Sequence, residues 1–347
     1  MFNAAAMSQP PANTVVRYAG NPVLSAKNTP YPSALTFNAG VVRHDGRYLM
    51  VFRNDYGHDG SGGFQGTNIG LAVSKDGITW QVEPNPILCE AEVRNELKKA
   101  MGHRYGAHFV KRIYDPRLTV VDGKILMCFA IDTAHGICGG VASTEDLKKF
   151  TWLSVSAPDN RNMVLFPRRI HGRYFRYERP MPVYMREHPE FFPTWCAESD
   201  DLVYWGRNRP VLGADEVPYA NSKVGPAAPP VETSKGWLVT IHAVHRDPAN
   251  RLRGWEPKGW YKTYYAGLML TDLDDPSKVI GLMRQPLLSP ETNYEIDGFR
   301  GNVIFPCGMI LEDSGEVKIY YGAADTCVAL ATAHVDDLLA ACEPLPG

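Results

Sequence analysis

Several features are scarce in this chain of 347 residues, and each absence excludes a class of protein. No run approaches the roughly 18 apolar residues that a membrane-spanning helix needs, so we predict no membrane segment. The first residues, MFNAAAMSQPPANT, lack the basic start and apolar stretch of a signal peptide, which favours a cytoplasmic location. The formal net charge is −2, so the chain as a whole offers no positive field for nucleic acid.

Paired cysteines and metal-binding motifs are missing as well. The seven cysteines are an odd number and form no CxxC pair, which indicates free thiols in a reducing compartment. The histidines form no HExxH motif, and no glycine-rich phosphate loop lies between a strand and a helix. We therefore expect neither a metal nor a cofactor.

The chain does contain a repeated phrase, in which two runs of β-forming residues flank a turn centred on glycine. The copies are GVVRHDGRYLMVFR at 40–53, LTVVDGKILMCFA at 118–130, LFPRRIHGRYFRYER at 165–179, PPVETSKGWLVTIHA at 229–243 and GMILEDSGEVKIYYGAAD at 308–325. Each turn carries a polar residue before its glycine, as in Asp45-Gly46 and Asp122-Gly123, which is typical of a tight hairpin.

A second, weaker phrase with its own turn follows each copy. It reads NIGLAVSKDGITW, GGVASTEDLKKFTW, TWCAESDDLVYW, YAGLMLTDLDDP and VALATAHVDDLL in turn. Two hairpins per unit make a four-stranded blade, and five units predict an all-β, five-bladed β-propeller. A β-sandwich or two stacked β domains are the alternatives, because they also alternate strands and glycine turns. We expect residues 1–16 to be flexible and residues 17–347 to form one domain.

In a propeller, the innermost strands of all blades line one central channel, so residues at their ends converge. Polar residues mark the starts of the first strands, at Asn38, Asp115, Arg161, Asn162, Lys223 and Asn302. They also mark the ends of the second strands, at Arg53, Asp132, Arg179, His242 and Asp325. With Arg117, and with His242 counted as a cation, cations outnumber carboxylates at the expected funnel. This surplus predicts an anionic ligand.

Eight segments together resemble glycoside hydrolase family 130, the β-mannoside phosphorylases and their hydrolytic relatives. They are TFNAGVV (36–42), FRND (52–55), YDPRLT (114–119), NRNMVLFPRRIHGRY (160–174), ERP (178–180), SKVGPAAPPVETSKGWL (222–238), YEIDGFRGNVIFPCG (294–308) and YYGAADT (320–326). The resemblance extends from about residue 17 to about residue 335. It implies a propeller with its active site at the central funnel.

The resemblance also implies an activity: inverting phosphorolysis of a β-mannoside to α-mannose 1-phosphate. Asp115 matches the catalytic acid of the family, whose proton is thought to reach the leaving oxygen through a hydroxyl of the mannose. The phosphate-binding residues fall on Arg161, Asn162, Arg179, Lys223, His242 and Tyr264. The sugar-binding residues fall on Asn38 and Arg53. Inorganic phosphate is then a co-substrate.

One position departs from the family pattern. Where some phosphorylases of the family have an aspartate that holds the mannose, this chain has Phe299, which accepts no hydrogen bond from a hydroxyl. Asp297 and Arg300 are the neighbouring candidates for sugar contacts. Two loops are expected to select the acceptor sugar, a glycine-rich segment at 56–68 and an aromatic and basic segment at 246–265, although the second is equally compatible with an ordered surface loop.

Two other functions remain open from sequence. A β-mannosidase of the same fold would need a carboxylate to activate water, for which Asp132, Glu295, Asp297 and Asp325 are candidates. A non-catalytic propeller that binds glycans is the other. The basic residues favour the phosphorylase, because a hydrolase has no use for a phosphate site. The sequence does not give the linkage, the acceptor sugar or the oligomeric state. A homo-oligomer is compatible with the sequence.

Overall fold

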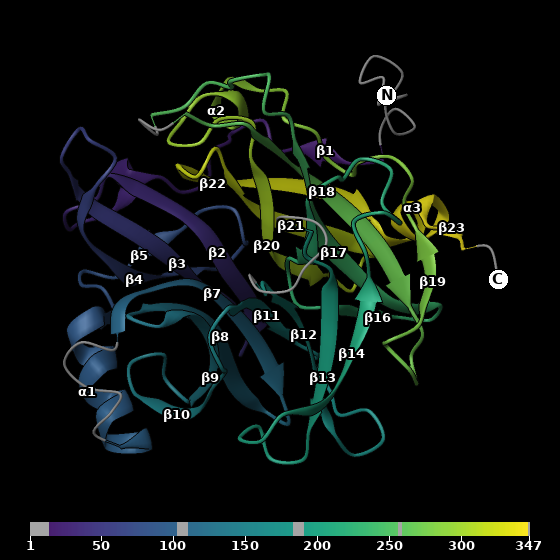
Figure 1. Cartoon of the computed structure of the whole chain (residues 1–347), viewed down its shortest axis with the longest axis horizontal. Coiled ribbons are helices and arrows are strands. Elements are labelled where there is room, and N and C mark those ends of the chain that lie inside the picture. Colours follow the sequence, from purple (N-terminus) through teal and green to yellow (C-terminus); the bar gives the residue numbers. More distant parts are fainter. Residues whose placement is uncertain (1–13, 103–109, 183–190, 256–258, 346–347) are drawn as a thin grey trace.

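Five antiparallel sheets surround a central axis and form the five-bladed β-propeller that the repeats predict (Figure 1). The computed structural model describes residues 14–102, 110–182, 191–255 and 259–345. Among these residues, no helix is long and apolar enough to cross a membrane. Each of the first three blades takes its strands from one continuous stretch of chain, and blade 4 departs from this only through Glu343–Pro344 near the C-terminus. This continuity is why the sequence shows the blades as repeats.

The strands of the first three blades are consecutive. Blade 1 contains β2 (Leu35–His44), β3 (Arg47–His58), β4 (Phe64–Ser74), β5 (Gln81–Val82) and the short β6 (Leu88–Cys89). Blade 2 contains β7 (Val110–Val121), β8 (Lys124–Thr133), β9 (Gly136–Thr144) and β10 (Phe150–Val155). Blade 3 contains β11 (Asn160–Leu165), β12 (Tyr174–Pro180), β13 (Thr194–Ser199) and β14 (Gly206–Leu212).

The last two blades are less regular. Blade 4 contains β15 (Lys223–Pro226), β16 (Val231–Thr233), β17 (Gly236–Arg246), β18 (Lys262–Thr271), β19 (Val279–Leu282) and β23 (Glu343–Pro344). Blade 5 contains β20 (Ile304–Leu311), β21 (Glu316–Ala323), β22 (Cys327–His334) and β1 (Val16–Arg17). The helices are η2 (Ala26–Asn28), α1 (Glu90–Met101), α2 (Asn293–Ile296) and α3 (Val335–Ala341). Helix α1 lies beside blade 2 in Figure 1.

Glycine turns close the inner hairpins, as the sequence predicts. Asp45 and Gly46 have φ values of 49° and 71°, and Asp122 and Gly123 have 52° and 75°. Positive φ at both central residues is the requirement of the tight turn whose twist matches that of the strands. The repeated dipeptide therefore has a conformational cause.

The outer turns of the first four blades share an aspartate that accepts backbone hydrogen bonds. Asp76, for example, accepts from the N–H groups of Ile78 and Thr79, both at 2.8 Å. The prediction of a second hairpin in blade 5 is wrong, because β22 is followed directly by helix α3. The N–H of Asp336 donates to Nδ1 of His334, which caps that helix.

The N-terminal strand replaces the missing outer strand of blade 5 and closes the ring. Val16 pairs with Thr332 and Arg17 with Ala331. The guanidinium of Arg17 also donates from Nε to Oε1 of the buried Glu295 at 2.8 Å. The expected boundary after residue 16 thus falls inside a strand, while most of the expected flexible segment lies outside the described residues.

The innermost strands bulge at one equivalent level in three blades. The register shifts after Phe37 in blade 1, after Tyr114 in blade 2 and after Arg161 in blade 3. The bulged residues Asn38, Asp115 and Asn162 have φ values of 50°, 52° and 60°. Asn and Asp tolerate this left-handed conformation better than other side chains, and bulges re-aim side chains beside functional sites.

Candidate active site

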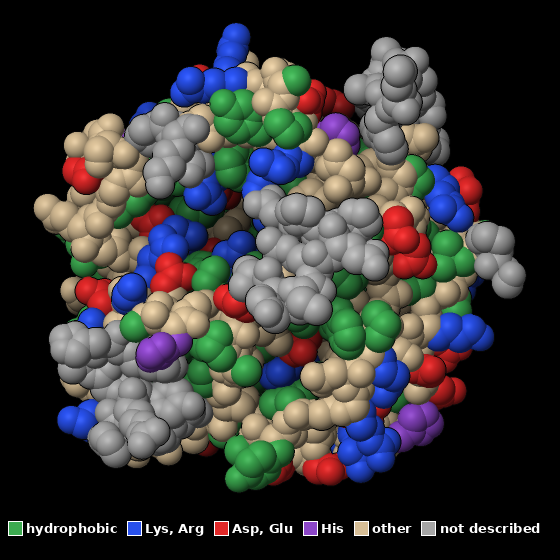
Figure 2. Space-filling view, in the orientation of Figure 1, with side chains coloured by type: hydrophobic (Ala, Val, Ile, Leu, Met, Phe, Trp, Pro, Cys, Tyr) green, Lys and Arg blue, Asp and Glu red, His purple; other side chains and the backbone are tan. Residues whose placement is uncertain are grey.

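A cavity lies in the central channel where the polar strand ends converge. Figure 2 shows Lys and Arg side chains gathered around a hollow on this face. The cavity has an empty volume of about 480 Å³. Its lining residues are Asn38, Arg53, Asp115, Arg161, Asn162, Arg179, His242, Trp260, Tyr264, Arg300, Val303, Phe305 and Asp325. Nine of the eleven expected site residues are among them, and Lys223 lines the adjoining mouth.

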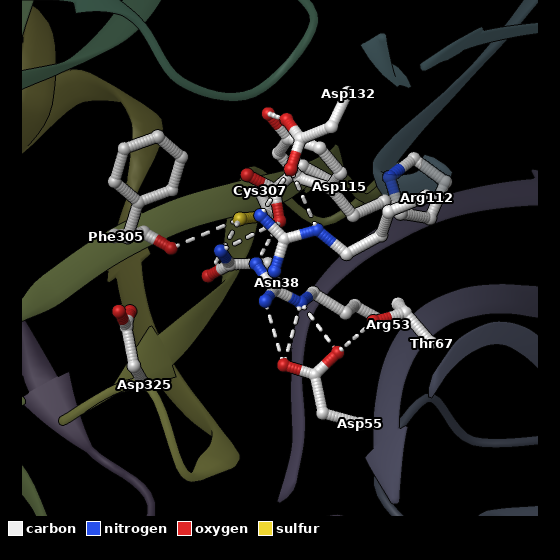
Figure 3. A network of polar contacts seen from close by, with 12 residues as sticks. Asn38, Arg53, Asp55, Thr67, Arg112, Asp115, Asp132, Phe305, Cys307 and Asp325 are labelled. Atoms are coloured by element: carbon white, nitrogen blue, oxygen red, sulfur yellow. Dashed lines mark hydrogen bonds and ion pairs between the residues drawn. The ribbon is translucent and has the colours of Figure 1, made fainter. Parts of the chain in front are cut away.

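Asp115 lies at the centre of a polar network that joins blades 1 and 2 (Figure 3). Its Oδ1 accepts a hydrogen bond from Nδ2 of Asn38 at 3.0 Å and lies 3.6 Å from Nη1 of Arg53. Burial raises the pKa of Asp115, but Arg53, Arg117, Asn38 and Arg161 outweigh burial, so the pKa is lowered overall. The carboxyl is therefore ionised in the free protein at neutral pH.

Arg53 is held rigidly on all sides. Its Cζ lies 4.6 Å from the ring centroid of Phe37 and 5.1 Å from that of Tyr114. Its Nε and Nη2 donate to the carboxylate of Asp55, with the Nη2 contact at 2.6 Å. Asp55 is fully buried and also accepts from Oγ1 of Thr67 at 2.6 Å. These contacts leave Nη1 of Arg53 facing Asp115.

Asp325 is a second carboxylate in the same cavity. Sequence reasoning marked it as a strand end and as a base for a hydrolase, but did not place it among the sugar-binding residues. Its Oδ2 lies 3.4 Å from Nη1 of Arg300. Burial raises the pKa of Asp325, and Asp115 and Asp55 raise it further against the opposing effect of Arg300 and Arg53. The two cavity carboxylates therefore have pKa values shifted in opposite directions.

The structure does not bring Asp297 to the cavity. Asp297 is exposed at the end of α2 and is absent from the residues that line the inner cavity or its mouth. Phe299 is 7% exposed and packs with Leu35 and Phe37, so no carboxylate enters at this position. Asp325 and Arg300 supply the polar groups on this side instead.

The opposite side of the cavity carries the basic residues. Arg179 and Lys223 are buried, and both lie near the ring of Phe192, at 5.9 Å and 5.8 Å. Arg161 forms no ion pair with any residue that the structure describes, and its Nε is buried without a hydrogen-bond partner there. A half-buried guanidinium that lacks an anion favours a site for an anionic ligand.

His242 is part of this side, but it is not a cation in the free protein. Burial lowers its pKa well below the usual value, and the nearby Arg179, Lys223, Arg161 and Arg117 lower it further. Its Nδ1 lies 3.2 Å from the carbonyl oxygen of Pro226, which only accepts, so the proton is on Nδ1. Nε2 then accepts from Nδ2 of Asn162 at 3.3 Å. Counting His242 among the cations was therefore wrong.

A glycine makes room for this arrangement. A Cβ on Gly225 would lie 2.4 Å from Cε1 of His242 and 2.8 Å from Cδ of Arg179. No side chain fits at such distances. Gly225 is therefore required for the imidazole and the guanidinium to approach the innermost strand of blade 4.

The two loops expected to select the acceptor meet at the mouth of the cavity. The rings of His58 and Trp255, one from each loop, lie 6.1 Å apart. Phe64 packs edge-on against Phe299 at 5.3 Å, and the N–H of Trp255 donates to the carbonyl of Phe299 at 3.0 Å. Residues 256–258 of the second loop lie outside the described part of the chain.

The other carboxylates proposed for a hydrolase are engaged elsewhere. Asp132 at the mouth accepts from Arg112 and from the hydroxyl of Tyr114, the latter at 2.8 Å. Glu295 accepts from Arg17 and from the hydroxyl of Tyr321 at 2.8 Å, remote from the cavity lining. Among the described residues, no group of three or more His, Cys, Asp or Glu side chains is placed to bind a metal.

Comparison with known proteins gives consistent similarities. Residues 8–344 match the model of a family described as β-1,4-mannooligosaccharide phosphorylase, glycoside hydrolase family 130. The chain is 34% identical to the β-1,4-mannooligosaccharide phosphorylase of Ruminococcus albus over 94% of this chain and 90% of that protein. It is 29% identical to the 1,2-β-oligomannan phosphorylase of a Thermoanaerobacter species, over 93% and 98%.

Solved structures share the fold. A β-1,2-mannobiose phosphorylase from Listeria innocua, in complex with β-1,2-mannobiose, superposes with a TM-score of 0.76 at 24% identity, covering 94% of this chain and 99% of that one. A structure from work on β-1,2-mannoside hydrolases within the same family superposes with a TM-score of 0.72 at 22% identity, covering 94% and 96%. At these identities the superpositions support the fold alone.

Proposed function

Because the chain belongs to glycoside hydrolase family 130, we propose that it cleaves a β-mannoside by phosphorolysis, with inversion, to α-mannose 1-phosphate and the shortened sugar. The observation that carries this proposal is that two groups of residues line one cavity. Asp115, Asn38 and Arg53 contact one another in the first group, and Arg161, Arg179 and the adjoining Lys223 supply the cations of the second. Mannose binds to the first group and phosphate to the second.

The reaction follows from this division. A phosphate oxygen attacks the anomeric carbon while the bond from that carbon to the glycosidic oxygen breaks on the opposite face. Phosphate carries its own nucleophilic oxygen, so the protein supplies cations and hydrogen-bond donors and needs no general base. Asp115 releases the proton that the leaving oxygen gains, through a hydroxyl of the bound mannose.

Asp115 must be protonated to act as an acid, although it is ionised in the free protein. In the free protein, Arg161 lowers the pKa of Asp115. Bound phosphate brings negative charge close to Arg161. Phosphate then offsets the effect of that cation, and the pKa of Asp115 rises. The same charge favours a proton on His242. Phosphate binding and proton uptake are thus coupled, and the acid is formed only when the nucleophile is present.

Mannose recognition follows from the other polar groups. Asn38 and Arg53 contact the sugar together with Asp115, and we assign the role of the family aspartate to Asp325, which pairs with Arg300. In this arrangement Arg300 contacts the sugar beside its partner Asp325. Asp297 makes no contact with the sugar. The remaining phosphate contacts come from Asn162, His242 and Tyr264.

The linkage, the catalytic domain and the location of the protein complete the proposal. We propose a β-1,4 linkage, because the family model and the 34% identical relative both carry that name, whereas other relatives are named for β-1,2 linkages. Residues 17–347 act as one catalytic domain. Phosphate and sugar phosphates are retained in the cytoplasm, which fits a cytoplasmic enzyme that uses phosphate as co-substrate and no cofactor. Its partners are then the small-molecule substrates, and the enzyme can form a homo-oligomer.

A panel of β-1,4- and β-1,2-linked mannosides, incubated with and without phosphate, tests the proposal. We expect mannose 1-phosphate only when phosphate is present and fastest release from a β-1,4-linked substrate. Release of free mannose at the same rate without phosphate would indicate the hydrolase instead.

A further inference from the structure

Trp260 is a cavity residue to which neither the sequence motifs nor the mechanism gives a role. It is 8% exposed and lines both the inner cavity and its mouth. It packs with Val303, Phe305 and Cys307, and its carbonyl accepts from the N–H of Leu252 at 2.8 Å. The side chain is therefore held in place beside the substrates.

An aromatic ring and a guanidinium pack against the indole. The ring of Tyr264 lies 5.9 Å away at an interplanar angle of 18°, and Cζ of Arg300 lies 5.0 Å from the indole centroid. A pyranose ring would need a bare aromatic face for stacking. The neighbours of Trp260 therefore argue against sugar stacking on this indole and direct attention to the N–H at its edge.

That edge carries a hydrogen-bond donor without a partner. Nε1 of Trp260 is buried and unpartnered, as it is in Trp80 and Trp152 among the described residues. The donors of Trp205 and Trp237 are satisfied by the carbonyls of Leu202 and Leu273. A buried N–H without an acceptor is costly. Of the three unpartnered indoles, Trp260 is the one that lines the cavity, where a ligand can supply the acceptor.

The ring stack indicates which ligand this is. Tyr264 lies between Trp260 and His242, because its ring is also 6.2 Å from that of His242 at an angle of 15°. Three nearly parallel rings thus form one wall. His242 contacts Asn162 and lies near Arg179 and Lys223, so the wall starts among the basic residues and reaches Arg300 at its Trp260 end. Groups on the basic side need a ligand rich in acceptors, which describes phosphate.

We propose that the indole N–H of Trp260 donates a hydrogen bond to an oxygen of the bound phosphate, which makes Trp260 a specificity-determining residue for the nucleophile. This inference rests on the proposed phosphorolysis. It adds a neutral donor to the cations, and a neutral donor in the plane of a fixed ring selects position rather than charge alone.

The W260F substitution tests this role, since phenylalanine keeps an aromatic ring and removes the N–H. The lost bond to a charged group is expected to raise the KM for phosphate about tenfold or more, while the KM for the mannoside stays within about threefold. W152F is the matched control, because it removes an equally unpartnered indole N–H outside the cavity and is expected to leave both KM values unchanged. An unchanged phosphate KM in folded W260F, or a rise in the mannoside KM alone, would overturn the proposal.

A second measurement on the wild-type protein does not depend on how W260F folds. Phosphate titrated into ¹⁵N-labelled enzyme is expected to shift one indole N–H resonance in the NMR spectrum, and mannose alone is expected to shift it less. Calorimetry in parallel reports whether phosphate binds at all. If phosphate binds and no indole resonance moves, the inference about Trp260 is wrong while phosphorolysis stands. If phosphate does not bind, both fail.

Discussion

Nη1 of Arg53 lies 3.6 Å from Oδ1 of Asp115, although the two residues come from different blades. The contact is close enough to lower the pKa of the carboxyl, and it lies on the side of the cavity assigned to mannose. Arg53 itself is fixed by Asp55 and by the rings of Phe37 and Tyr114. The acid and the sugar-binding cation are therefore one unit, and its properties lead to the following predictions.

Replacing the acid should be harmful only when the leaving group needs a proton. D115N is expected to lower kcat/KM for a mannoside about a thousandfold, within the range that general acid catalysis contributes. β-Mannosyl fluoride releases fluoride without a proton, so D115N should retain most of its activity on that substrate. D325N serves as the comparison: it removes a sugar contact and should be impaired on both substrates. If D325N and not D115N were rescued by the fluoride, Asp325 would be the acid.

Phosphate should change the pH dependence. Because the pKa of Asp115 is lowered in the free protein, little of the acid form exists at neutral pH, and activity at low phosphate should fall as pH rises. Saturating phosphate raises this pKa, so the alkaline limb of the profile should move to higher pH. Calorimetry in two buffers of different ionisation enthalpy should also report proton uptake on phosphate binding, part of which D115N abolishes. A limb that does not move with phosphate would contradict the coupling.

Asp55 should act through Arg53 without touching substrate. D55N loses the charge that holds Nε and Nη2 of Arg53, and we expect kcat/KM for the mannoside to fall about tenfold to a hundredfold. The KM for phosphate should stay unchanged, because Asp55 is remote from the basic side. T67S keeps the hydroxyl that donates to Asp55 and is expected to resemble the wild type. An effect of D55N on phosphate KM alone would argue against the positioning role.

The ring closure predicts a stability effect with a defined sign. Burial raises the pKa of Glu295, but Arg17 and the N–H groups of Glu291 and Thr292 outweigh it, so the folded pKa lies below the ordinary value of a glutamate. The contribution is therefore complete at neutral pH and is lost as pH falls through the lowered folded value. E295Q should reduce the free energy of unfolding by about 3 kcal/mol at pH 7 and by less in acid.

Two comparisons make the test of Glu295 specific. E291Q removes the exposed partner of Arg17 and should cost less than about 1 kcal/mol. Folded E295Q should also keep its activity, since Glu295 does not line the cavity. A stable but inactive E295Q, measured by denaturant unfolding and by turnover, would instead return Glu295 to the candidates for catalysis.

Much of the fold follows from the sequence because each blade repeats the same local chemistry. Hairpins with Asp45-Gly46 or Asp122-Gly123 can be predicted, because the turn requires positive φ and the sequence supplies residues that tolerate it. The closure of the ring by Val16 and Arg17 cannot be predicted from the sequence. A strand of two residues has no periodicity, and its partner strand lies at the other end of the chain. Because β1 supplies the outer strand of blade 5, the chain after β22 forms helix α3 in place of a second hairpin.

The site was predictable in its positions but not in its charges. Strand-end polarity and family motifs together indicated ten residues that line the cavity. The neutral state of His242 depends on burial among cations from other blades, which no local pattern records. Asp297 is exposed at the end of α2 while Phe299 packs against Leu35 and Phe37, and no local pattern shows which of these two side chains turns inward.

The most direct test of phosphorolysis is the product formed by the wild-type enzyme from a β-1,4-mannooligosaccharide in the presence and absence of inorganic phosphate. The account predicts α-mannose 1-phosphate, one molecule for each bond cleaved, and no cleavage without phosphate. Free mannose formed at a rate independent of phosphate would contradict it, because Arg161, Arg179 and Lys223 would then not bind the nucleophile.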